Sequence, residues 1–115
     1  GNPAGAFLFY AFIGIVAIQY LKRYCFDKAF ISCTSLDTAY GIYDSGDMIA
    51  EFHRSILNCA DKKFLIADHT KFDRSAFARM GTLDSVDVLV TDKELTKDWK
   101  NHLKECSIHL VECGK

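Results

Sequence analysis

Short apolar runs that end in polar residues recur along the chain and have the composition of buried strands. We predict three of them at residues 27–33 (DKAFISC), 63–67 (KFLIA) and 86–91 (VDVLVT). A fourth strand is expected at residues 107–112, close to the carboxyl end. Continuous apolar strands of this kind are typical of parallel sheets, in which both faces are covered.

Segments with helical spacing lie between these runs. Residues 48–57 place their apolar side chains on one face, and Asp44 and Ser45 precede them as expected helix caps. Leu95, Trp99 and Leu103 mark one stripe of a later helix. Strands that alternate with helices predict an α/β fold, with a mainly parallel sheet, right-handed crossovers and flanking helices.

The opening of the chain allows two interpretations. Residues 3–21 contain no charged residue and are followed by Lys22 and Arg23, as in a short membrane span with a positive inner flank. However, Gly5 and Gly14 interrupt the run, and residues 15–24 have helical spacing with a polar face. We favour a strand followed by a packed helix, in a cytoplasmic protein without membrane contact. A membrane-anchored interaction domain is the alternative.

Composition narrows the function classes. The 115 residues are half apolar, enough for one domain, and the formal net charge of −1 gives no electrostatic footprint for nucleic acid. The five cysteines form no C-x-x-C pair, so we expect reduced, buried thiols. The four histidines lack the spacing of metal ligands. We therefore expect no metal and no cofactor.

Polar side chains follow each of the first three predicted strands. In parallel sheets, ligands bind beyond the carboxyl ends of the strands, where these side chains should meet. Carboxylates, hydroxyls and one lysine suit a phosphorylated, polyhydroxylated small molecule. The residues concerned are Thr34, Ser35 and Asp37, then Asp68, Thr70 and Lys71, and finally Asp92.

Each of these residues also has a purely structural interpretation. Asp92 precedes a helix, and we favour a capping role for it. Asp37 can form an Asx-turn before Tyr40 and Gly41. Lys71 and His53, taken alone, are most simply solvated side chains. The connection formed by residues 68–85 is longer than loops without a function usually are, so we expect a functional loop or a short helix there.

The order of several motifs resembles the carboxyl-terminal sensor domain of the DeoR family of bacterial transcription regulators. The segments that carry the resemblance are DKAFISC, TSLD, YGIYDS, AEFHRSIL and FLIADHTKFDRSAFARMGTLDSVDVLVTD, from about Gly14 to the end. The resemblance implies a Rossmann-like fold shared with ribose-5-phosphate isomerases, glucosamine-6-phosphate deaminases and CoA transferases. It also implies a sensor of a phosphorylated sugar or sugar alcohol.

The same resemblance assigns roles to individual residues. Lys71 is similar in position to a lysine that contacts substrate phosphate in the isomerases, and Asp37 to an acid that meets hydroxyls. Ser35 stands where the family usually has glycine, and His53 where it usually has lysine. With Asp68 and Thr70 they form the expected effector site.

The resemblance also implies that no residue is catalytic. Ile31 and Thr34 occupy the places of two catalytic acids in the isomerases, and neither can act as a general acid or base. We therefore expect a sensor rather than an enzyme. A fragment of a sugar-phosphate isomerase or deaminase is the alternative.

Compared with that family, residues 1–115 correspond to a partial sensor domain, truncated in its N-terminal half. The winged helix-turn-helix and the first strands with their phosphate loop are expected outside the chain, so DNA contact would occur only through that absent part. Such a fragment should expose a sheet edge and apolar surface. We therefore expect a homo-oligomer.

Overall fold

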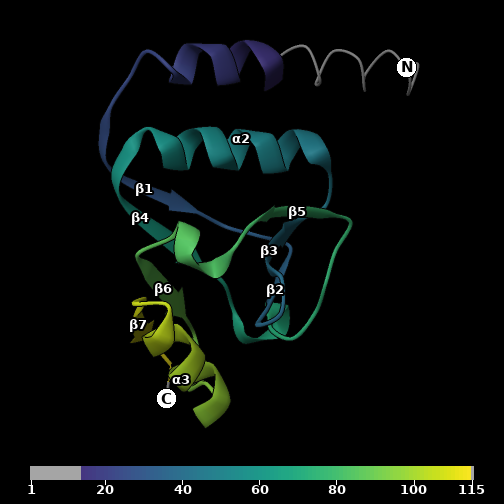
Figure 1. Ribbon diagram of the computed structural model, residues 1–115, viewed down its shortest axis with the longest axis vertical. Helices are drawn as coiled ribbons and strands as arrows, with labels where there is room; N and C mark the ends of the chain where they lie inside the picture. The colour runs from purple at the N-terminus through teal and green to yellow at the C-terminus, as the bar shows by residue number, and fades with distance from the viewer. Residues whose placement is uncertain (1–13, 115) are drawn as a thin grey trace.

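The computed structural model describes residues 14–114 and contains two sheets (Figure 1). Four parallel strands form the larger sheet, in the order β1-β4-β6-β7. Their bounds are β1 Phe26–Ile31, β4 Ala60–Ile66, β6 Val88–Thr91 and β7 His109–Glu112. A smaller antiparallel sheet has the order β2-β3-β5, with β2 Ser35–Asp37, β3 Gly41–Asp44 and β5 Ala78–Gly81.

Helices connect the strands of the larger sheet. The helix α2 (Asp47–Asn58) precedes β4, and α3 (Lys97–Glu105) lies between β6 and β7. Two short 3-10 helices, η1 (His69–Lys71) and η2 (Leu83–Ser85), flank β5. The predicted α/β fold with a mainly parallel sheet is confirmed.

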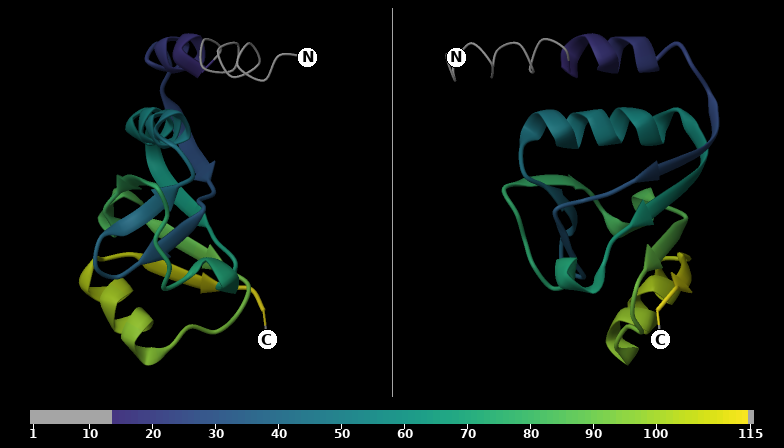
Figure 2. Two further views of the ribbon diagram at one scale, coloured as in Figure 1. Left: turned by 90° about the vertical axis from the view of Figure 1, so that its right-hand side faces the viewer. Right: turned by 180° about the vertical axis from the view of Figure 1, so that it is seen from behind.

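One face of the parallel sheet carries the core. Ile31, Leu65 and Leu89 pair across β1, β4 and β6, and all three are almost completely buried. Leu57 of α2 and Leu103 of α3 belong to the same buried cluster, so both helices pack on this face (Figure 2). Burying each large apolar side chain contributes about 1.5–3 kcal/mol.

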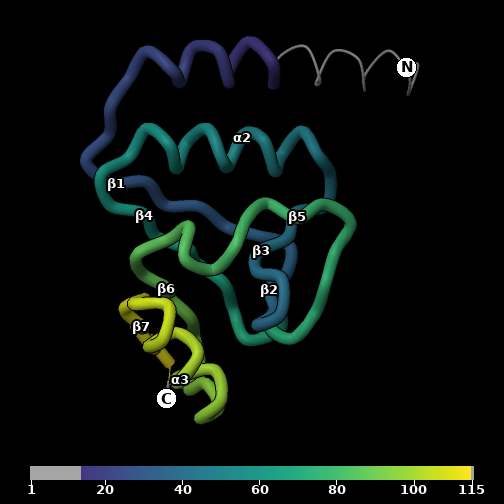
Figure 3. The backbone as a smooth tube through the Cα atoms, viewed as in Figure 1, coloured from purple at the N-terminus to yellow at the C-terminus, as the bar shows by residue number. Residues whose placement is uncertain are grey.

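The smaller sheet corrects the sequence analysis. Thr34, Ser35 and Asp37 were expected in a loop after the first strand, but residues 35–37 form β2 and pair with β3 (Figure 3). The segment at residues 68–85 contains η1, β5 and η2. The strands β2, β3 and β5 are short and each contains polar or charged residues, so they lack the apolar run by which the sequence analysis recognises a strand.

The predicted helix caps were also wrong. The N-cap of α2 is Gly46, without a side-chain hydrogen bond, while the carboxylate of Asp44 meets His53 instead. At α3 the cap is Thr96, whose hydroxyl oxygen accepts from Trp99 N at 3.3 Å. Asp92 therefore does not cap α3.

The opening helix ends three residues earlier than the predicted end at residue 24. Residues 14–21 are helical, and the N–H groups of Arg23 and Tyr24 close the turn on the carbonyls of Tyr20 and Leu21. The strand expected before it lies outside the described residues. Between residues 14 and 114, no helix combines the length and the apolar character needed to cross a membrane.

Substitution of Gly41 tests the hairpin between β2 and β3. Gly41 has a φ of +114°, and a Cβ there would overlap the carbonyl oxygen of Gly81 on β5. Gly41→Ala is expected to lower the free energy of unfolding by about 1–3 kcal/mol, because the backbone cannot keep this conformation without a clash. Urea denaturation measures the change.

Gly46→Ala is the matched control, because a Cβ at Gly46 meets nothing within 4 Å and its φ of −162° is extended. Equal losses in the two variants would contradict the role assigned to Gly41.

Candidate functional site

The carboxyl ends of β1, β4 and β6 bring a group of polar side chains together. Cys33 follows β1, Asp68 and Lys71 follow β4, and Asp92 follows β6. The charges of Lys71 and Asp68 both shift the pKa of the Cys33 thiol. The charges of Lys71 and Asp92 in turn shift the pKa of Asp68. Four side chains, those of Cys33, Asp68, Lys71 and Asp92, therefore lie near one another at this edge of the sheet, which we call the rim.

Cys33 is a buried thiol that follows β1, an edge strand of the parallel sheet. Burial raises its pKa from 9.0 to about 12, the nearby Lys71 lowers it in part, and Asp44 and Asp68 raise it further. A thiol with this pKa stays neutral near pH 7 and is a poor nucleophile. Cys33 therefore contributes an uncharged wall to the rim.

The short helix η1 holds Lys71 in place. Asp68 caps it by accepting from Thr70 N at 2.8 Å, and the Thr70 hydroxyl donates to the same carboxylate oxygen. The hydroxyl and the N–H of Thr70, with the charge of Lys71, hold the pKa of Asp68 below its usual value. Lys71 itself is half-buried, unlike the fully solvated lysine that its sequence context suggests.

Asp92 ties η1 to the end of β6. Its Oδ1 accepts from His69 N at 2.7 Å, and its Oδ2 lies 2.9 Å from His69 Nδ1. The hydrogen bond from the His69 ring is the largest influence on the pKa of Asp92, which is lowered. Asp92, which was expected to cap a helix, instead holds the start of η1, directly after β4.

Asp44 and His53 form a second polar contact, between β3 and α2. His53 Nδ1 lies 3.0 Å from Asp44 Oδ2, and the two side chains are only 12% and 3% exposed. His53 is thus not the solvated residue of the polar helix face that its spacing suggests. Asp44 also influences the Cys33 thiol, which places this pair beside the rim.

Asp37 forms the Asx-turn that the sequence predicts. Its Oδ1 accepts from Tyr40 N at 2.7 Å and Gly41 N at 3.0 Å, and its Oδ2 accepts from the Tyr43 hydroxyl at 3.0 Å. Burial acts to raise the pKa of Asp37, but these hydrogen bonds outweigh it and lower the pKa overall. Much of the hydrogen-bonding capacity of this carboxylate is therefore used within the hairpin.

Ser35 lies on β2, opposite Tyr43. Its hydroxyl is buried and has no hydrogen-bond partner among residues 14–114. Leu36, the next residue, bridges Phe72, so β2 runs beside η1. The hydroxyl is thus a polar group without a structural role in the described part of the chain.

The structure therefore brings together only part of the predicted site. Asp68, Thr70 and Lys71 form one turn. His53 contacts Asp44 between β3 and α2, beside the rim. Asp37 is engaged in its own hairpin turn. The sequence analysis did not assign Cys33, Asp44 or His69 to the site. The partners of Asp44 and His69 are distant in the sequence, and Asp44 was expected to cap a helix.

This arrangement is suited to binding a ligand that carries an anionic group and hydroxyls. Lys71 supplies a cation, and the carboxylates at the strand ends accept hydrogen bonds from hydroxyl groups. At Ile31 and Thr34 the chain has no acid or base that could move a proton on a bound sugar. In residues 14–114, no three His, Cys, Asp or Glu side chains are grouped to hold a metal ion.

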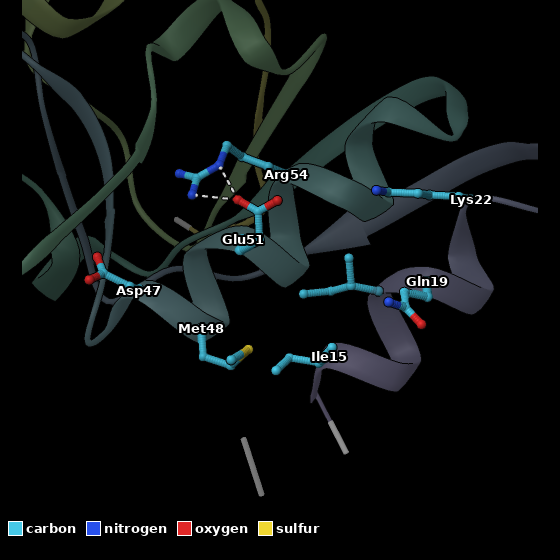
Figure 4. Close-up of a pocket in the computed structure, with 8 residues that line it drawn as sticks. Ile15, Gln19, Lys22, Asp47, Met48, Glu51 and Arg54 are labelled. Carbon is cyan, nitrogen blue, oxygen red and sulfur yellow. Dashed lines mark hydrogen bonds and ion pairs between the residues drawn. The ribbon is translucent and has the colours of Figure 1, made fainter. Parts of the chain in front are cut away.

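Of the hollows among the described residues, we compare two as ligand sites. One, of about 210 Å³, is formed at the rim by residues that include Ile66, Asp68 and Asp92. A larger groove of about 470 Å³ separates the helix at residues 14–21 from α2 (Figure 4). Four charged residues line that groove: Glu51 and Arg54 are bonded to each other at 2.9 Å, and Lys22 and Asp47 are the other two. The rim is the candidate site because ligands of parallel sheets bind beyond the carboxyl ends of the strands, where Lys71 lies.

Comparison with known proteins gives consistent matches. The family model described as "DeoR C terminal sensor domain" matches residues 9–93. The chain is 28% identical over 102 residues to the glycerol-3-phosphate regulon repressor of Haemophilus influenzae, covering 89% of the chain and 40% of that protein. It is 28% identical over 103 residues to the transcriptional regulator IolR of Bacillus subtilis, covering 88% of the chain and 41% of that protein.

A third relative has higher identity over a shorter region. The L-fucose operon activator of Escherichia coli is 33% identical over 76 residues, which cover 66% of the chain and 31% of that protein. The chain thus spans less than half the length of each of these regulators.

The buried state of Cys33 can be tested by its reactivity. At about pH 8 a thiolate reagent should modify the exposed Cys25 and Cys113 rapidly and Cys33 very slowly, because a thiol of raised pKa carries little thiolate. Cys33→Ser is the control, and it should remove one reactive thiol only in denaturant. Rapid loss of the Cys33 thiol in the folded protein would contradict the assignment.

The same shift gives a pH dependence of stability. Because the pKa of Cys33 is raised in the folded state, neutral Cys33 contributes to the free energy of unfolding. This contribution is complete below pH 9.0 and is lost as the pH rises toward about 12. Urea denaturation of wild type and Cys33→Ser across this range is expected to show a smaller alkaline loss of stability in the variant.

Proposed function

Since the chain belongs to the family of DeoR C-terminal sensor domains, we propose that it binds a phosphorylated sugar or sugar alcohol at the rim formed by β1, β4 and β6. The chain would be the effector-sensing part of a transcription regulator. DNA binding would reside in a part of the regulator outside these residues. The observation that carries the proposal is the half-buried Lys71 at the capped turn after β4.

The position of Lys71 supports a phosphate contact. Ligands of open parallel sheets bind beyond the carboxyl ends of the strands, and η1 lies at that edge. The hydrogen bonds of Asp68 and Asp92 fix this turn from two sides, so the lysine is presented from a preorganised element. A phosphate dianion would neutralise its charge in a partly desolvated place.

The remaining groups at the rim suit the hydroxyls of a sugar. Asp68 is exposed and ionised, and its free lone pairs can accept from a hydroxyl. Ser35 offers a buried hydroxyl without a partner among residues 14–114, and His53 offers a ring held by Asp44. Asp37 has fewer free lone pairs, so we assign it a secondary role.

The names of the relatives support the class of ligand. One is named for a glycerol-3-phosphate regulon, which is a phosphorylated polyol system, and another for the L-fucose operon. These relatives are named as a repressor and an activator, which agrees with Ile31 and Thr34 in the places of the two catalytic acids.

The proposed regulation follows from population shift. An effector changes operator affinity only if it binds two arrangements of the regulator with different affinities. Contacts with η1 and with α2, through His53, would let one ligand bias the relative position of these elements. Such a regulator would act in the cytoplasm, where the five unpaired cysteines remain reduced.

Replacement of Lys71 tests the proposed phosphate contact. Lys71→Ala is expected to weaken binding of a phosphorylated sugar by roughly 10-fold to 100-fold, because a charged hydrogen bond contributes about 1.5–3 kcal/mol. Isothermal titration calorimetry with a panel of pentose and hexose phosphates would measure the dissociation constants. The panel includes the unphosphorylated sugars, for which the variant should make little difference.

Lys97→Ala is the matched control, since Lys97 is an exposed lysine of α3. Equal affinities in wild type and Lys71→Ala, with binding retained, would show that Lys71 is not the phosphate ligand. Absence of binding by every phosphorylated sugar would argue against the ligand class itself.

A further inference from the structure

The segment that follows the Lys71 turn is held between two elements. On one side, Leu36 of β2 bridges Phe72, and the Leu36 carbonyl oxygen accepts from Arg74 N at 3.3 Å. On the other side lies Trp99 of α3, whose ring meets the Phe72 ring edge-on at 5.0 Å between centroids. The chain directly after Lys71 is therefore packed between β2 and α3.

Trp99 is also joined to this segment by a hydrogen bond. The indole Nε1–H of Trp99 donates to Asp73 Oδ1 at 2.9 Å. Trp99 is only 3% exposed, and a buried indole N–H that loses its partner is destabilising. Because Asp73 supplies that partner, the segment after Lys71 and the first turn of α3 are bound to each other across 26 residues of sequence.

The backbone of Asp73 has an uncommon conformation. Its φ is +60°, in the left-handed region that favours glycine, although aspartate and asparagine adopt it more readily than most other residues. Asp73 thus combines a backbone that tolerates this conformation with a side chain that accepts from the indole. Glycine would supply only the first of these properties, and asparagine would supply both.

These contacts adjoin the turn that carries the proposed phosphate ligand. Within η1, Lys71 N donates to Asp68 O at 3.1 Å, and η1 ends at Lys71, one residue before Phe72. Packed side chains leave little free space around them. The turn therefore cannot move without moving Trp99 or breaking the contacts of Trp99 with Phe72 and Asp73.

We propose that Trp99 couples the Lys71 turn to α3, so that a ligand bound at Lys71 also stabilises the position of α3. The coupling rests on the proposed function, because it concerns the regulation of the same site. A coupling free energy acts equally in both directions. Loss of the Trp99 contact therefore weakens ligand binding, although Trp99 itself is buried. In this role Trp99 and Asp73 are positioning residues.

Hydrogen exchange of the ligand-free chain, followed by NMR, tests the link itself. Asp73→Gly keeps the backbone conformation and removes the acceptor, and Trp99→Phe keeps an aromatic ring and removes the donor. In both variants the amides of Thr70, Lys71 and the first turn of α3 are expected to exchange up to about 10-fold faster, because the turn and α3 open locally. The amides of α2 should keep their wild-type rates.

Asp73→Asn is the matched control, since it retains both the acceptor and the backbone preference, and it should exchange as the wild type does. Unchanged exchange at Thr70 and Lys71 in both Asp73→Gly and Trp99→Phe would overturn the link. So would an equal acceleration in α2, because it would show a general loss of stability and no specific connection between the turn and α3.

Calorimetric titration with ribose 5-phosphate and glycerol 3-phosphate tests the effect on binding. Asp73→Gly and Trp99→Phe are expected to bind the phosphate that the wild type binds about 10-fold more weakly, and Asp73→Asn about equally. Wild-type affinity in the first two variants would overturn the coupling to the ligand. A wild type that binds neither compound would count against the proposed function, while the exchange rates decide separately whether Trp99 links the turn to α3.

Discussion

The winding of the parallel sheet in one direction is the constraint on which the other features depend. The strands β1, β4, β6 and β7 lie side by side in chain order. Right-handed crossovers that always advance the same way pass over the same face, so α2 and α3 cover one side only. The same parallel order brings all carboxyl ends to one edge. The rim with Lys71 and the placement of both helices on one face are thus two consequences of one topology.

The parts of the fold that could be predicted are those with strong local signals. The sequence shows the apolar runs of β1, β4 and β6 and the apolar stripes of α2 and α3. Burial of a regular strand or helix selects apolar residues in such patterns. The hairpin of β2 and β3 was missed because Ser35 and Asp37 are polar and the strands are short. The bounds of α2 and α3 moved because their caps are Gly46 and Thr96 rather than the nearby acids.

The candidate site shows the same division between local and distant interactions. The Asx-turn of Asp37 could be predicted, since its acceptors and donors lie within four residues. The contacts of Asp92 with His69 and of Asp44 with His53 span 23 and 9 residues and depend on the assembled sheet. The importance of Lys71 came from resemblance to a family, and its half-buried position in a fixed turn now supplies a physical reason.

Amide NMR of the isotope-labelled chain, titrated with a phosphorylated sugar, tests the site most directly. Binding at the rim predicts the largest shifts in the amides of Asp68 to Lys71 and of Cys33 and Thr34, with little change for the unphosphorylated sugar. The largest shifts along the groove between residues 14–21 and α2 would contradict the account, because they would place the ligand on the far side of α2.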